Sequence, residues 1–101
     1  MNPDSWLQAV RAHLSADRVV EGLQRLPNER LAFSEADVRG RVAVAEMMSA
    51  VGLSPTIDTA LNVRARTQGR ELSLPPIIIG SHVDTVPAPG LYDGALGVLC
   101  G

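Results

Sequence analysis

The feature that most constrains the fold of this chain is the stretch PPIIIG, residues 75–80. A run of β-branched residues without polar alternation is typical of a strand buried on both faces, as in the interior of an α/β sheet. Proline cannot donate a ladder hydrogen bond, so we expect the strand to begin after the prolines and to cover about residues 77–82. The run therefore favours an α/β fold.

Periodicity and capping signals predict two helices before this strand. Apolar residues at near-helical spacing indicate one helix over about residues 4–26. Ser34 followed by Asp37 is a loose form of the capping box, and it predicts a second helix over residues 35–51. The apolar face of this second helix would carry Val38, Val42, Ala45 and Met48.

The remaining elements are short. Alternation of apolar and polar residues predicts strands over about residues 56–58 and 61–67. Small and apolar residues predict the start of a helix over about residues 94–101. Helices, strands, a doubly buried strand and a further helix place the chain in the α/β class.

Composition excludes several classes of function. The chain has 101 residues, of which 46% are hydrophobic and 20% charged, which fits one small folded domain. The net charge of −2 gives no basic footprint for nucleic acid. No apolar run is long enough to span a membrane, and the first residues lack the pattern of a signal peptide. We therefore expect a cytoplasmic protein with neither nucleic-acid nor membrane partners.

Polar side chains that can bind metal follow the predicted buried strand. In open α/β sheets, ligands bind beyond the carboxyl ends of the strands, where residues 80–84, GSHVD, would lie. His82 and Asp84 would project to the same side, because strand side chains repeat every two residues. An imidazole can bind a metal through one nitrogen while a carboxylate accepts the other N–H. The pair is either a ligand with its support, two ligands, or a hydrogen-bonded histidine at a strand end.

A third such residue, Asp93, follows the loop TVPAPGLY and comes eleven positions after His82. Prolines and a glycine shape this loop into a turn. At the start of a helix, the carboxylate of Asp93 would interact favourably with the helix dipole, and its two oxygens could also bridge two divalent cations. The spacing leaves both roles open.

Two long segments resemble one enzyme family. They are FSEADVRGRVAVAEMMSAVGLSPTIDTALNVRAR, residues 33–66, and GSHVDTVPAPGLYDGALGVLCG, residues 80–101. Both are similar to the dinuclear metal-dependent amidohydrolases related to aminoacylases and carboxypeptidases. The similarity is greatest to the hydantoinase/carbamoylase branch, with N-carbamoyl-L-amino-acid hydrolase, β-ureidopropionase and allantoate amidohydrolase.

This resemblance implies a site and a reaction. His82 and Asp93 would bind metal, with Asp93 bridging two divalent ions (Zn, Mn, Co or Ni). Asp84 would be the catalytic aspartate that orients His82. The substrate would be a small N-carbamoyl or ureido compound, hydrolysed by a metal-activated water. The fold implied is a three-layer α/β/α metallopeptidase-like catalytic domain, in an enzyme that is a homodimer at full length.

The chain also departs from the family pattern. Leu61 stands where the family has glycine. If this position is a left-handed turn, the leucine would strain it by about 1 kcal/mol or more. The family's general base, its further metal ligands and its dimerisation domain have no counterpart in residues 1–101. We therefore expect an incomplete, N-terminal portion of the catalytic domain, inactive alone. The alternatives are a related aminoacylase, dipeptidase or allantoate amidohydrolase, and a non-catalytic remnant or interaction fragment.

Overall fold

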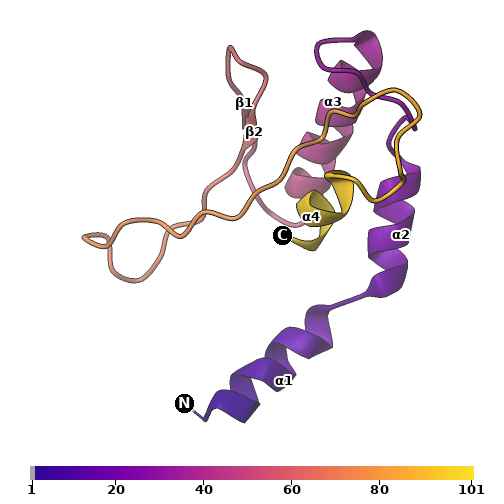
Figure 1. The fold of residues 1–101 in the computed structure, drawn as a ribbon. Helices are drawn as coiled ribbons and strands as arrows, with labels where there is room; N and C mark the ends of the chain where they lie inside the picture. Colours follow the sequence, from indigo (N-terminus) through magenta and orange to yellow (C-terminus); the bar gives the residue numbers. More distant parts are fainter. Residues whose placement is uncertain (1) are drawn as a thin grey trace.

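The computed structural model of the chain describes residues 2–101, and Figure 1 shows the arrangement of its elements. Within this range the elements, in chain order, are α1 (Pro3–His13), α2 (Ala16–Gln24), α3 (Glu35–Ala50), β1 (Thr56–Ile57), β2 (Val63–Arg64) and α4 (Ala95–Cys100). The mixture of helices and strands agrees with a partial α/β domain. None of the helices formed by residues 2–101 has the length and apolarity needed to cross a bilayer.

The predicted single helix over residues 4–26 is two helices in the structure. Leu14 has an extended backbone, and the side chain of Ser15 accepts a hydrogen bond from the backbone N–H of Arg18 at 3.2 Å. Serine at this position satisfies a free N–H of a new helix, which favours a break over continuation. As a result α1 points away from the other helices and buries none of its residues (Figure 1).

The core lies where α2, α3 and α4 meet the segment that carries residue 83. Its buried apolar side chains are Leu23, Leu26, Val44, Val83 and Ala95. Helices α2 and α4 approach closely at Gly22, where an added Cβ would lie 2.1 Å from Leu99 Cδ1. Glycine at this point of α2 makes room for the Leu99 side chain.

Helix α3 begins as its capping box predicts, but it buries only part of the predicted face. Ser34 accepts from the backbone N–H of Asp37 at 3.2 Å, and Asp37 reaches back to the N–H of Phe33 at 2.9 Å. The residues of α3 that are buried are Asp37, Gly40 and Val44. On the predicted apolar face, Met48 packs against the core, whereas Val38 and Val42 are 45% and 44% exposed. The side of α3 that carries Asp37 faces inward, because a buried carboxylate must stay with its hydrogen-bond donors, the Phe33 N–H and Arg41 Nε–H.

The two strands are shorter than predicted. They form an antiparallel pair in which Thr56 faces Arg64 and Ile57 faces Val63. Between them Asp58 organises a turn, and its carboxylate accepts the backbone N–H groups of residues 60 and 62, each at 2.9 Å. Leu61 has φ 66°, in the left-handed region. This turn occupies residues 58–62 and bounds the strands on one side, and on the other side the pairing ends at Thr56 and Arg64, next to Pro55.

Residues 77–82 do not form the predicted buried strand. The side chains of the isoleucine run are 92%, 87% and 73% exposed, from Ile77 to Ile79. A strand needs hydrogen-bonded neighbours. Within residues 2–101, the only such pairing near the isoleucine run comes after it, where Thr85 forms a single parallel bridge with Leu31. The segment is therefore extended but unpaired, and it leaves an apolar surface open to solvent.

Candidate metal centre

The structure brings together the three residues that the sequence singles out. His82 and Asp84 lie on the extended segment that leads into the core at Val83, and Asp93 directly precedes α4. His82 Nε2 is 3.5 Å from Asp93 Oδ1, and His82 Nδ1 is 3.7 Å from Asp84 Oδ1. The three side chains are between 40% and 56% exposed, so an ion from solvent can reach them.

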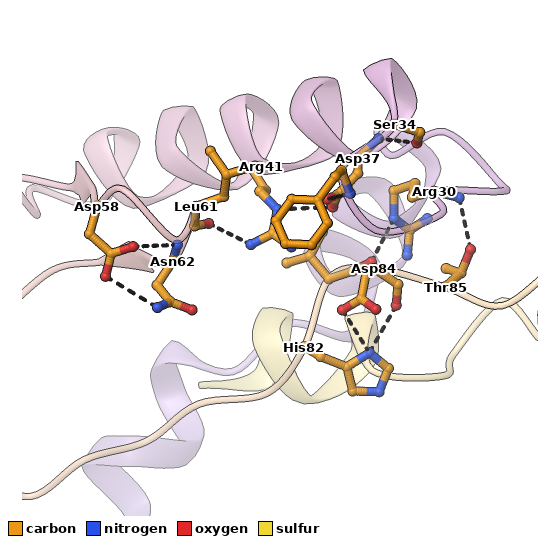
Figure 2. Close-up of polar contacts among 12 residues, drawn as sticks. Arg30, Ser34, Asp37, Arg41, Asp58, Leu61, Asn62, His82, Asp84 and Thr85 are labelled. Atoms are coloured by element: carbon orange, nitrogen blue, oxygen red, sulfur yellow. Dashed lines mark hydrogen bonds and ion pairs between the residues drawn. The ribbon is translucent and has the colours of Figure 1, made fainter.

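The two ring nitrogens of His82 have different partners. Nδ1 lies 2.9 Å from the backbone carbonyl oxygen of Asp84, closer than the carboxylate of the same residue (Figure 2). A carbonyl oxygen can only accept, so this hydrogen bond requires a proton on Nδ1, and in the neutral imidazole it leaves the lone pair of Nε2 free. The nitrogen facing Asp93 is thus the one available to a metal ion.

The distance between His82 and Asp93 fits two ligands of one ion. At 3.5 Å the contact is longer than a good hydrogen bond, whereas two donors each about 2.0–2.1 Å from a tetrahedral ion are about 3.4 Å apart. Two ligands do not complete a coordination sphere. The described residues, 2–101, contain no group of three or more histidine, cysteine or acidic side chains arranged to hold a metal ion.

Gly94, just before α4, and Gly97, within it, let the helix lie close to His82 and Ser81. Gly94 has φ 72°, and a Cβ on it would lie 2.4 Å from His82 Cε1 and 2.5 Å from His82 Nδ1. One turn further on, a Cβ on Gly97 would lie 3.0 Å from the side chain of Ser81. The glycine after Asp93 is therefore required both for the turn into α4 and for the imidazole that lies against it.

Sequence reasoning missed the residues that hold the segment in place. Arg30 is only 4% exposed, and its Nε–H donates to the carbonyl of Val83 at 2.9 Å. Thr85, 7% exposed, accepts from the backbone N–H of Arg30 at 2.8 Å. Burial lowers the pKa of Arg30, and the negative charges of Asp37 and Asp84 oppose this shift. An arginine in a loop gives no sequence signal of burial, since two of its partners, Val83 and Thr85, lie more than fifty residues away.

Known proteins similar to this chain are named as hydrolases or as allantoate deiminases. The chain is 42% identical over 73 residues to the N-carbamoyl-L-amino-acid amidohydrolase of Pseudomonas sp. (strain NS671), a match covering 72% of this chain and 18% of the relative. It is 40% identical over 70 residues to the ureidoglycolate hydrolase of Oryza sativa subsp. japonica, covering 69% and 14%. It is 38% identical over 71 residues to the allantoate deiminase of Arabidopsis thaliana, covering 70% and 14%.

These relatives confirm the resemblance to the carbamoylase and allantoate amidohydrolase branch of hydrolases. The chain spans less than a fifth of the length of each of them. No family model matches the chain. No solved structure matches it either.

Proposed function

We propose that this chain supplies part of the metal centre of a hydrolase that cleaves a C–N bond in N-carbamoyl or ureido compounds. The observation that carries the proposal is the contact between His82 Nε2 and Asp93 Oδ1 at 3.5 Å, with the other ring nitrogen held by Asp84. This arrangement leaves one nitrogen and one carboxylate oxygen, both half-exposed, for a divalent cation.

Each of the three residues has a distinct task in this proposal. His82 would hold one cation through Nε2, and the carbonyl of Asp84 would keep the proton on Nδ1. Asp93 has two carboxylate oxygens and would hold both cations. The cations would be Zn, Mn, Co or Ni. When bound, they would lower the pKa of a water molecule so that it can attack the carbonyl carbon at neutral pH. The general base and the remaining ligands would come from outside residues 1–101.

The substrate class follows from the relatives. Their names refer to N-carbamoyl amino acids, ureidoglycolate and allantoate, which share a carbonyl carbon bonded to two nitrogens. We take an N-carbamoyl-L-amino acid as the first substrate to test, because the relative with 42% identity carries that name. Allantoate and ureidoglycolate are the alternatives.

The proposal also concerns the fold. The exposed isoleucine run, residues 77–79, would form the buried strand of a three-layer α/β/α domain once other strands pair with it. By "the complete enzyme" we mean the longer protein that would contain these strands and the missing ligands.

Hydrolysis of an N-carbamoyl-L-amino acid by the complete enzyme tests the proposal. We expect His82→Ala to abolish turnover, because it removes the nitrogen that faces Asp93. The matched control is His13→Ala, which removes the exposed histidine at the end of α1 and should leave turnover unchanged. Residues 1–101 alone should show no turnover. Full activity of the His82→Ala enzyme would contradict the proposed site.

A further inference from the structure

Arg30 is a buried charged residue that connects the start of the chain to the candidate metal site. It lies between α2 and α3 and is 4% exposed. Its guanidinium donates from Nε to the carbonyl of Val83 at 2.9 Å, and from Nη1 to the carbonyl of Pro27. The planar guanidinium thereby joins Pro27, in the loop after α2, to the residue between His82 and Asp84.

The backbone of Arg30 holds the next part of the same segment. Its N–H donates to Thr85 Oγ1 at 2.8 Å (Figure 2), and its carbonyl accepts from the N–H of Thr85 at 2.8 Å. The residues before and after Asp84 are therefore both bound to Arg30. The carbonyl of Asp84, which accepts from the His82 ring, lies between these two attachment points.

Helix α3 leaves space for the arginine side chain. A Cβ on Gly40 would lie 2.7 Å from Arg30 Cδ and 3.4 Å from Val83 Cγ1. The charges of Asp37 and Asp84 favour the charged guanidinium. The two hydrogen bonds from Nε to Val83 and from Nη1 to Pro27 favour a guanidinium at this place over a lysine ammonium, whose three donors have no fixed planar arrangement.

We propose that Arg30 is a positioning residue for the metal site. By holding Val83 through its side chain and Thr85 through its backbone, it fixes the Asp84 carbonyl that determines the orientation and tautomer of His82. The inference rests on the proposed function, since it assigns Arg30 a role in a metal site that His82 would form. Residues that orient a metal-binding histidine typically contribute 10–100-fold to metal affinity.

The test is the Zn²⁺ affinity of the complete enzyme, measured by competition with a chelator and paired with its melting temperature. We expect Arg30→Met to weaken affinity by about 10–100-fold. Arg30→Lys keeps the charge but not the planar fork, and we expect it to remain at least about tenfold weaker than the native enzyme. Gly40→Ala, which pushes against Arg30, should weaken affinity in the same direction. If Arg30→Met does not fold, the Zn²⁺ affinity of Gly40→Ala still tests the role of Arg30.

Val44→Ala is the control for a merely structural role. Val44 is buried in the core at 3% exposure and makes no polar contact with the segment, so its truncation should lower the melting temperature and leave Zn²⁺ affinity unchanged. Native affinity in the Arg30 variants, or an equal loss in Val44→Ala, would overturn the inference. If His82→Ala also retains native affinity, the proposed function itself is wrong. If only His82→Ala loses affinity, the failure belongs to Arg30 alone.

Discussion

At the scale of single residues, Gly94 carries two requirements at once. Its φ of 72° strains any residue with a Cβ, and a Cβ there would lie 2.4 Å from the imidazole of His82. We expect Gly94→Ala to lower the free energy of unfolding by more than about 1 kcal/mol, measured by denaturant titration. The control is Gly90→Ala in the preceding loop, where a Cβ meets no atom within 4 Å. Equal stability of the two variants would contradict this reading of Gly94.

The residue types at the candidate site could be predicted from the sequence, but the atoms that make the contacts could not. The pattern of His82, Asp84 and Asp93 indicates metal chemistry, and the structure places the three side chains together. The partner of His82 Nδ1 at 2.9 Å is the carbonyl of Asp84, whereas the sequence pattern suggests its carboxylate. A backbone group has no sequence signature, because every residue has one.

At the scale of elements, the turn between β1 and β2 contains Leu61, the residue that stands where the family has glycine. Leu61 has φ 66°, which glycine tolerates and side chains with a Cβ resist. We expect Leu61→Gly to be more stable than Leu61→Ala by about 1 kcal/mol, since both lack the leucine side chain and only glycine relieves the strain. At the neighbouring Ala60, where φ is not positive, glycine should instead be destabilising. Thermal unfolding decides, and a Leu61→Ala protein more stable than Leu61→Gly would exclude strain at this position.

Element positions were more predictable than element boundaries and faces. The capping residues Ser34 and Asp37 are visible in the sequence, and α3 begins beside them. The break between α1 and α2 is not visible in the apolar spacing, which continues across it. The hydrogen bond of the Ser15 side chain to the backbone competes with a continuous helix, and the spacing of apolar residues carries no sign of that bond. The buried face of α3 was missed because it includes a carboxylate, Asp37, that is paired with Arg41 at 2.9 Å.

At the scale of the whole molecule, the unmet expectation is the strand over residues 77–82. A run of consecutive isoleucines favours a strand, but a strand forms only where other strands supply hydrogen bonds. Within residues 2–101 the sheet contains only β1 and β2, and the isoleucine run is exposed. Burial in an α/β sheet depends on partners distant in sequence, which a local pattern does not reveal.

In the whole protein, we propose that His82 and Asp93 bind the same metal centre. The most direct test is the metal content of the complete enzyme by inductively coupled plasma mass spectrometry after removal of loosely bound ions. We predict two divalent ions per native chain, one ion lost in His82→Ala, and both sites impaired in Asp93→Ala, because a bridging carboxylate serves both ions. Two tightly bound ions in both variants would contradict the account.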